Sequence, residues 1–336
     1  MKRIYPNIPF IGEDKPLCYW IKMIRAQVRD HNKDNISRTM AYQGFFDLHR
    51  EVRWSLLASL VSRNAGWNMT DLKGGILGDL LSRRRRDDLF MTYERANWTI
   101  FEDAYPQLLV YHYSVQAGKG LFHLLDELQV SSFMKTEWIY FWEHRDLGRL
   151  VTALIVNEQN LIQEPVILDP VYRRIFTSPL FLVEDRLHFS SVIFPTLDGR
   201  LYGASVHGFR DLDNRILLGK KLYRILFHSD HFTDIMKWAD MVEPKGSRRE
   251  YAEGTTGSSS PDLRSVYEEV PHHLRDKRDW SKDRSVKNEW FDPVDLPSEV
   301  EIKSWFVHKE KLLMRMNGLA KCMKKLFPLS ALTRRS

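Results

Sequence analysis

The chain has 336 residues, of which 28% are charged and 43% apolar, with 50 basic and 44 acidic side chains. This balance is typical of a folded, soluble protein and excludes a disordered tail or a bundle of membrane helices. The two cysteines, Cys18 and Cys322, are too few for a disulfide framework or a cysteine-based zinc site. No stretch approaches the length of a transmembrane helix, and the N-terminus lacks the apolar core of a signal peptide, so we expect a cytoplasmic protein.

Apolar residues recur at helical spacing along the first half of the chain. The pattern predicts helices over residues 47–63, 70–80, 87–105, 107–116, 120–129, 132–145 and 147–161. We expect the first of these helices to end at Asn64-Ala65-Gly66, because these residue types favour turns. We expect the third helix to end before Pro106, because the residue ahead of a proline avoids the helical conformation.

The pattern changes between residues 165 and 208, where prolines and β-branched runs replace helical spacing. Residues 188–194 and 200–203 flank the turn dipeptide Asp198-Gly199, an arrangement that predicts a β-hairpin. An extended loop that crosses the surface is the alternative. Helical spacing returns at residues 213–228 and continues toward Met241.

These patterns divide the chain into three parts. Residues 1–244 should form a helical core domain that includes the hairpin or extended segment at 165–208. Residues 245–297 are polar and dense in charge, so we expect a linker that is extended or partly disordered. Residues 298–336 should form a basic amphipathic helix and tail. The expected fold class is therefore mainly α: an irregular multi-helix domain with a minor β-hairpin and a C-terminal basic amphipathic helix.

The positive net charge of the chain, +6, is confined to its C-terminal end. Residues 303–336 hold nine of the 50 basic residues and one of the 44 acidic residues, so residues 1–302 carry a net charge of −2. A basic amphipathic helix lies on anionic lipid, binds nucleic acid, or docks on its own domain with lysine stems along apolar surface. We therefore expect either docking or an anionic partner, which is a membrane surface or a nucleic acid.

A dense group of polar residues surrounds a tryptophan in the segment 63–73. The group comprises Arg63, Asn64, Trp67, Asn68, Thr70, Asp71 and Lys73. If residues 64–66 form a turn, the N–H groups that start the next helix, together with Arg63 and Lys73, can bind an anionic small ligand. The alternative is a hydrogen-bonded helix corner with Trp67 in the core. The spacings of a P-loop and of GxGxxG are absent.

Glu94, Asn97 and Trp98 share one face of the predicted third helix, because they lie three and four residues apart. A carboxylate held beside a tryptophan can have its pKa raised and then act as a general acid or base. Glu94 is therefore the candidate catalytic residue, and Asn97 joins the candidate ligand-binding residues. The alternative is that Glu94 is solvated or paired within its own helix.

Two other polar groups were considered as sites. Glu158 lies in the polar stretch 157–160 and is a ligand-binding candidate, with capping and turn contacts as the alternative. His228, His231 and Asp234 lie three residues apart, a spacing that metal ligands can use, but no HExxH pattern supports them. We predict structural histidines there and no metal site, and the sequence identifies no cofactor.

Several segments together are similar to one bacterial family. They are residues 61–75, 93–98, 101–109, 157–160, 219–227 and 246–251. In these segments the chain resembles the YppC-like proteins, a bacillus-type family of unknown function, and the resemblance covers residues 35–252. It implies a cytosolic bacterial protein. It implies no activity, cofactor or catalytic residue.

No catalytic signature accompanies the basic end of the chain. We therefore expect a non-enzymatic binding or adaptor protein whose tail contacts an anionic partner, with a peripheral position at the membrane if that partner is lipid. The alternative is a hydrolase-type enzyme that acts on a phosphorylated or glycosidic substrate. In that case the Arg63–Asp71 corner positions the substrate and Glu94 is the acid–base, which requires the two groups to converge on one pocket.

Overall fold

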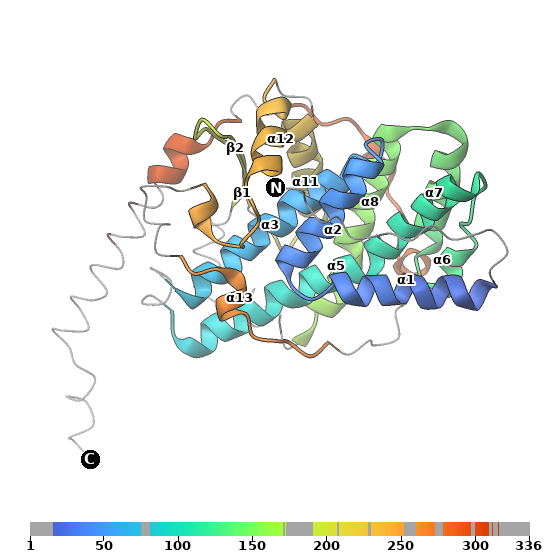
Figure 1. The fold of residues 1–336 in the computed structure, drawn as a ribbon, viewed down its shortest axis with the longest axis horizontal. Helices are drawn as coiled ribbons and strands as arrows, with labels where there is room; N and C mark the ends of the chain where they lie inside the picture. Colours follow the sequence, from blue (N-terminus) through green and yellow to red (C-terminus); the bar gives the residue numbers. More distant parts are fainter. Residues whose placement is uncertain are drawn as a thin grey trace, which may run out of the picture.

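A computed structural model describes residues 16–74, 81–170, 172, 191–206, 208–227, 230–251, 260–272, 278–296, 300–308, 311 and 315. The described part is mainly α-helical with one two-stranded antiparallel sheet (Figure 1), which confirms the predicted mainly α class with a minor β-hairpin. The helices and strands are α1 Leu17–His31, α2 Asn35–Leu48, α3 Trp54–Lys73, α5 Arg83–Ala117, α6 Leu124–Glu127, α7 Ser132–His144, α8 Leu147–Leu161, β1 Ser191–Pro195, β2 Leu201–Ser205, α11 Leu212–Phe227, α12 Phe232–Met241, α13 Leu263–Val266 and α14 Trp280–Asp283. A π-helical segment, Gln163–Ile167, and two 3-10 segments, Arg248–Glu250 and Asn288–Phe291, complete them.

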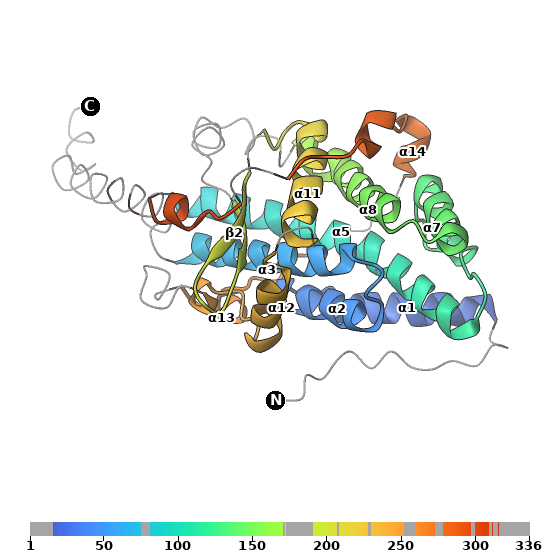
Figure 2. The same ribbon diagram turned by 90° about the horizontal axis from the view of Figure 1, so that it is seen from above.

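The centre of the fold is formed by α2, α3 and α5, which run along the long axis of the molecule (Figure 2). Ten of the 14 residues of α2 are buried, so this helix lies in the interior. It begins where the carboxylate of Asp34 accepts a hydrogen bond from the N–H of Ser37 at 2.6 Å. Helices α7, α8 and α11 cover the central helices on one side (Figure 2). The polar residues of the candidate sites are therefore held between packed helices.

The predicted turn at residues 64–66 is wrong, because α3 runs without a break from Trp54 to Lys73. Asn64 remains helical, and its side-chain amide donates to the carbonyl of Leu60 at 2.8 Å. Gly66 allows close packing instead of ending the helix: a Cβ there would lie 3.3 Å from the Cα of Gly246. Tertiary packing on both sides thus outweighs the turn preference of these residues. Residues 75–80 of the predicted second helix lie outside the described residues.

The predicted stop at Pro106 is also wrong, because α5 continues through this proline and spans 35 residues. A proline inside a helix removes one N–H donor and disturbs the carbonyl four residues earlier. All residues from Asp103 to Ser114 are buried, so the burial of apolar surface in this segment offsets that cost. The helix ends at Gly118, whose φ of 64° is the left-handed conformation that glycine favours.

The remaining helix predictions differ from the structure mainly at their ends. Helices α7 and α8 lie close to their predicted bounds, and the Asp146 carboxylate begins α8 by accepting from the N–H of Arg149 at 2.9 Å. The helix predicted at 120–129 is shorter, since α6 covers only Leu124–Glu127. The spacing that continues from 213 toward Met241 corresponds to two helices, α11 and α12.

The predicted β-hairpin is present. Strands β1 and β2 pair antiparallel with Pro195 opposite Leu201, and the intervening turn contains Gly199 with a φ of 78°. The alternative of a crossing loop is therefore wrong, although residues 188–190 of the predicted first strand lie outside the described residues. At the edge of β1 that faces away from β2, Ile193 pairs with the side chain of Asn64. The Ile193 carbonyl accepts from the Asn64 amide and the Ile193 N–H donates to the Asn64 oxygen, both at 2.8 Å.

Residues 245–297, which the sequence predicts to be a polar linker, include described residues that are buried. Leu263, Trp280 and Trp290 are buried in the hydrophobic core. Lys220 of α11 also donates to the carbonyl of Trp290 at 2.8 Å. A few large apolar side chains therefore anchor a segment whose composition is polar overall. The domain boundaries at residues 244 and 297 remain predictions.

Residues 300–306 dock on the hairpin, so the start of the C-terminal segment follows the docking alternative. The N–H of Gly203 donates to the carbonyl of Val300 at 3.0 Å, and the N–H of Ile302 donates to the carbonyl of Leu201 at 2.8 Å. These bonds form an isolated antiparallel bridge beside β2. Residues 303–308 are helical, and Phe306 is 5% exposed. Most of the predicted helix beyond residue 308 lies outside the described residues. Among the helices that are described, none is both long and apolar enough to cross a bilayer.

Candidate functional site

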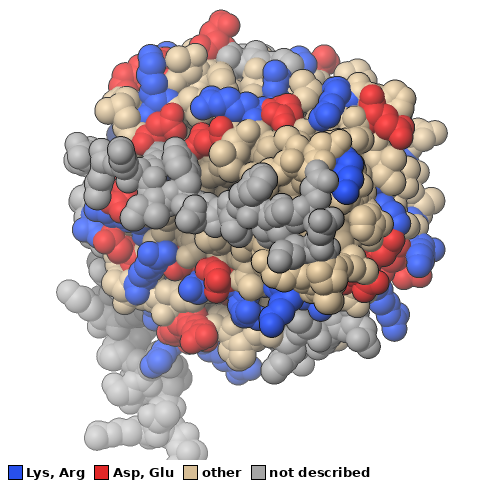
Figure 3. Space-filling model, turned by 45° about the vertical axis from the view of Figure 1, so that its right-hand side comes forward, with Lys and Arg blue, Asp and Glu red and all other residues tan. Residues whose placement is uncertain are grey.

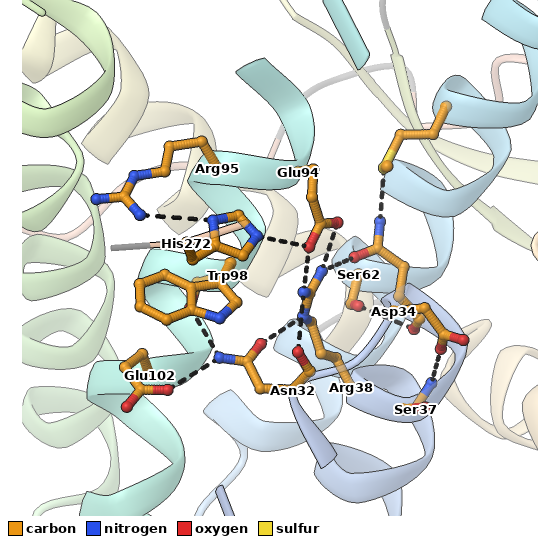
Figure 4. Close-up of polar contacts among 12 residues, drawn as sticks. Asn32, Asp34, Ser37, Arg38, Ser62, Glu94, Arg95, Trp98, Glu102 and His272 are labelled. Carbon is orange, nitrogen blue, oxygen red and sulfur yellow. Dashed lines mark hydrogen bonds and ion pairs between the residues drawn. The ribbon is translucent and has the colours of Figure 1, made fainter. Parts of the chain in front are cut away.

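Arg38 of α2 and Glu94 of α5 form a buried ion pair (Figure 4). Two guanidinium nitrogens of Arg38 donate to the two carboxylate oxygens of Glu94 at 2.9 and 2.5 Å, and both side chains are 1% exposed. The side-chain oxygens of Asn32 and Asn35 also accept from Arg38, at 2.7 and 2.8 Å. The bidentate geometry and the added acceptors satisfy the guanidinium, so the pair fixes α2 against α5.

His272, which is distant in sequence, covers this ion pair. Its ring stacks on Trp98 with centroids 4.5 Å apart and planes at 12° (Figure 4). A guanidinium can only donate, so Nδ1 of His272 accepts from Arg95 at 3.4 Å and its Nε2–H donates to Glu94 at 3.3 Å. The segment that carries His272 is therefore tied to α5 by both polar and ring contacts.

The pKa of the Glu94 carboxyl lies below its ordinary value. Burial alone raises this pKa, but the charge and hydrogen bonds of Arg38, with hydrogen bonds from His272 and Tyr267, more than offset the loss of hydration. A general acid or base works best with a pKa near the ambient pH. These contacts favour a structural carboxylate, paired with α2 and not within its own helix, and the catalytic role of Glu94 remains a prediction.

Arg63 of α3 pairs with Glu250. Its Nε donates to the Glu250 carboxylate at 2.5 Å, a second nitrogen donates to the carbonyl of Val242 at 2.8 Å, and its guanidinium lies 4.1 Å from the centre of the Trp238 ring. The other oxygen of Glu250 accepts from the N–H of Ser247 at 3.1 Å. Arg63 therefore holds the segment 242–250 on α3, and its positive charge is paired with a carboxylate of the same chain.

The other residues of the predicted anion site face different neighbours. Asp71 and Asn68 accept from Arg248 at 2.7 and 3.1 Å. Lys73 pairs with Asp87 at 3.0 Å and with Glu268 at 2.9 Å. The ligand cluster that the sequence predicts is thus spread around one continuous helix.

Trp67 and Thr70 belong to the interior of that helix packing. The Trp67 ring is 1% exposed and lies 4.6 Å from the ring of Tyr251, and the Thr70 hydroxyl donates to the carbonyl of Trp67 at 2.8 Å. Together with Asn64, which pairs with β1, these contacts favour the alternative of a hydrogen-bonded structural cluster. An anionic small ligand at residues 63–73 remains a prediction.

Arg63 and Glu94 belong to separate networks in the described structure. The Ser62 hydroxyl, adjacent to Arg63 in sequence, donates to the carbonyl of Asn35, and the Asn35 side chain accepts from Arg38. Arg63 itself contacts Glu250, and the described contacts of Arg63 and Glu94 include no common partner. The convergence on one pocket that a hydrolase requires receives no support from these contacts.

Glu158 of α8 differs from the other charged candidate residues because it forms no ion pair with a described residue. Its carboxylate accepts from the amide of the adjacent Gln159 at 3.0 Å. Loss of hydration raises the pKa of Glu158 to about 7, and the hydrogen bond from Gln159 offsets only part of this effect. The side-chain nitrogen of Asn97 has no hydrogen-bond partner in the described structure.

The predicted histidine group does not form one cluster in the described residues. His228 lies outside them. The ring of His231 stacks on Tyr202 with centroids 4.0 Å apart, and Asp234 pairs with Arg200 at 3.4 Å. Across the residues that the structure places, no group of three or more histidine, cysteine, aspartate or glutamate side chains has the arrangement of a metal site.

A chain of three side chains that sequence reasoning missed leads from Glu51 into the core. The Glu51 carboxylate lies 3.4 Å from Nδ1 of His49, and Nε2 of His49 lies 2.8 Å from Nδ1 of His112. If His49 donates to the carboxylate, His112 must donate to His49, and Nε2 of His112 is left as an unprotonated acceptor. Burial, followed by the charge of His49, lowers the pKa of His112 to about 4.

The most important residues that the sequence analysis missed are Arg38, Glu250 and His272. Arg38 offered a usable signal, because it lies four residues before Tyr42 and seven before Phe45 on an otherwise apolar helical face. A charged residue in such a face is rarely buried without a partner. Glu250 and His272 offered no such signal, because they follow segments whose composition is polar.

The comparisons with known proteins agree on the family but give no activity. The family model for proteins of unknown function described as DUF2515 matches residues 30–305. The chain is also 43% identical over 319 residues to the uncharacterized protein YppC of Bacillus subtilis (strain 168). This match covers 94% of the chain and 99% of that relative. No solved structure matches the chain. The YppC-like resemblance is confirmed, and the chain belongs to the DUF2515 family of proteins of unknown function.

Proposed function

We propose that this protein is a non-enzymatic binding protein whose C-terminal segment, residues 303–336, contacts an anionic lipid surface. The observation that carries the proposal is the separation of charge along the chain: residues 303–336 have a net charge of +8, and residues 1–302 have a net charge of −2. Figure 3 shows basic and acidic side chains mixed over one face of the body. A strongly positive appendage on a charge-balanced body is suited to an anionic surface.

The docked residues 300–306 support this proposal because they fix the point at which the basic segment begins. Backbone hydrogen bonds join this stretch to β2, and Phe306 packs near Tyr251 with ring centroids 6.2 Å apart. Arg248 lies 5.6 Å from the Phe306 ring. The basic residues that follow are thus attached to the body at a defined site.

The described cations of this segment are accessible. Lys303, Lys311 and Arg315 are exposed, and all three are helical. The sequence that follows places large apolar residues at helical spacing, namely Leu312, Leu313, Met316, Leu319, Met323 and Leu326. Helices that lie on lipid combine an apolar face with basic residues, whereas non-specific binding to nucleic acid depends mainly on phosphate contacts. The apolar residues therefore favour lipid over nucleic acid.

The polar clusters of the body also support binding over catalysis. Glu94 and Arg63, the residues expected to act in a hydrolase, each pair with an opposite charge from the same chain. Such pairs stabilise the arrangement of the helices, and breaking them leaves a buried charge without a partner. The body then serves as a rigid carrier for the basic segment.

The test is co-sedimentation with vesicles of phosphatidylglycerol and phosphatidylcholine, with pure phosphatidylcholine vesicles and a DNA duplex as separate arms. The tail variant is Lys321→Gln/Lys324→Gln/Lys325→Gln, and the matched control is Arg83→Gln/Arg84→Gln/Arg85→Gln, which removes the same charge from an exposed part of the body. Substitution is preferable to truncation before residue 300, because truncation would also remove the contacts to β2.

We expect the wild type to bind anionic vesicles, with an affinity that falls as salt rises. The tail variant should bind about 10- to 100-fold more weakly, because each basic residue near an anionic membrane contributes about 1 kcal/mol. Equal affinities of the tail variant and the control, or binding that is independent of salt, would refute the proposal. Binding to DNA alone would assign the tail to nucleic acid, and turnover of a phosphate or glycosidic substrate that Glu94→Gln abolishes would favour the hydrolase.

A further inference from the structure

The outer face of α1 carries a row of cations. Lys22, Arg25 and Arg29 follow one another at helical spacing, and Lys33 continues the row just beyond the end of the helix. All four residues are exposed. The opposite face of α1, with Trp20, Ile24 and Val28, is buried against the body. Helix α1 lies along the lower edge of the molecule in Figure 1. Its outer face takes no part in the buried ion pairs described above.

These cations have no acidic partner among the described residues, in contrast to the buried arginines of the helix packing. Arg38, Arg63 and Arg248 each pair with a carboxylate. None of Lys22, Arg25, Arg29 and Lys33 forms an ion pair with a described residue, and Arg25 donates a hydrogen bond of 2.9 Å to the carbonyl of Glu127. The outer face of α1 therefore presents positive charge that the described structure leaves uncompensated.

Apolar residues lie beside this row of cations. A groove of about 550 Å³ runs along α1, and its described lining combines Leu17, Cys18, Ile21 and Ala26 with Lys22, Arg25, Arg29 and Glu127. Leu17 is 44% exposed and Tyr19 is 42% exposed at the same end of the helix. Basic side chains bind phosphate oxygens, and apolar residues next to them favour the boundary between headgroups and acyl chains.

We propose that the outer face of α1 is a second contact site for anionic lipid, in which Lys22, Arg25 and Arg29 bind headgroup phosphates and Leu17 and Ile21 meet the apolar boundary. This inference rests on the proposed function of the C-terminal segment and names the part of the body that meets the same membrane. An acidic protein would match the charge, but the exposed apolar side chains beside the cations favour lipid. Two contact sites on one chain raise the overall affinity, because binding of the first increases the effective concentration of the second.

The position of Cys18 on this face allows a local measurement. Cys18 is exposed, and Cys322→Ser leaves it as the single thiol of the full chain. We would attach a polarity-sensitive fluorophore to Cys18 and add vesicles of phosphatidylglycerol and phosphatidylcholine. We expect a blue shift of the emission and protection from iodide quenching with anionic vesicles, and neither with pure phosphatidylcholine. Co-sedimentation of the labelled chain, measured in parallel, reports binding through the C-terminal segment.

The matched variants are Lys22→Gln/Arg25→Gln/Arg29→Gln and the body control Arg83→Gln/Arg84→Gln/Arg85→Gln, which lose the same charge. The α1 variant should bind anionic vesicles about 10- to 100-fold more weakly than the control, with an unchanged melting temperature in the absence of lipid. Vesicle binding with a Cys18 probe that stays in water, or equal affinities of the two variants, would overturn this inference and leave the proposed function intact. Absence of vesicle binding by the wild type would overturn both.

Discussion

Replacing Glu158 with glutamine should stabilise the protein at alkaline pH. The pKa of Glu158 is about 7 in the folded chain, against 4.5 for an ordinary glutamate, because the carboxyl loses hydration and no described cation pairs with it. The folded state therefore binds more protons than the unfolded state between pH 4.5 and 7, and the free energy of unfolding falls as the pH rises through this window. Each pKa unit corresponds to ~1.4 kcal/mol, so the ionised carboxylate costs about 3.5 kcal/mol above pH 7.

The assay is urea unfolding followed by tryptophan fluorescence from pH 4.5 to 8.5 at constant ionic strength. We expect the free energy of unfolding of Glu158→Gln to exceed that of the wild type by about 3.5 kcal/mol at pH 8.5. The difference should shrink toward pH 4.5, because glutamine does not titrate. Other titrating groups cancel in this comparison. Glu143→Gln, at an exposed position of α7, is the matched control and should follow the wild type. A constant difference between Glu158→Gln and the wild type across this pH range would refute the reasoning.

Three other predictions concern buried polar contacts, and urea unfolding measures each. Arg38→Met leaves the Glu94 charge without a partner and should cost about 3–5 kcal/mol; a double variant with Glu94→Met should recover part of this loss, and no recovery would contradict the argument. Asn64→Ala removes both hydrogen bonds to Ile193 and should cost about 2 kcal/mol; a cost below ~0.5 kcal/mol would show that the pairing is unimportant. The lowered pKa of His112, about 4, means that the free energy of unfolding falls as the pH drops from 6.5 toward 4. His112→Asn should lose less of this free energy over the same pH range. If the free energies of the variant and the wild type changed in parallel with pH, the prediction would be wrong.

The sequence was most informative where local pattern and tertiary packing agree. Helix α8 has the predicted bounds, and the Asp198-Gly199 turn identifies the hairpin. It misled where packing opposes a local preference, as at Gly66 and Pro106, which both lie inside long helices. In each case the residue type favours a helix end, but burial on several sides keeps the helix intact.

The candidate sites were harder to predict than the fold because their partners are distant in sequence. The segment 63–73 was identified as unusually polar, but its partners Glu250 and Arg248 lie in a segment that reads as a linker. The sequence predicts a catalytic role for Glu94, but its partner Arg38 lies 56 positions away and lowers its pKa. Residue types in one window show that a polar group needs partners, but only the packing of the helices shows which partners it has.

The sheet has only two strands, yet contacts within the described structure cover both of its hydrogen-bonding edges. The side chain of Asn64 occupies the outer side of Ile193, Pro195 at the end of β1 has no N–H to donate, and residues 300–302 occupy the outer side of β2. An unpaired strand recruits strands from other molecules and so initiates aggregation or domain swapping. Residues 300–302 therefore also protect the outer edge of β2 from pairing with another molecule. If proteolysis released these residues, the edge of β2 would be exposed and could start self-association.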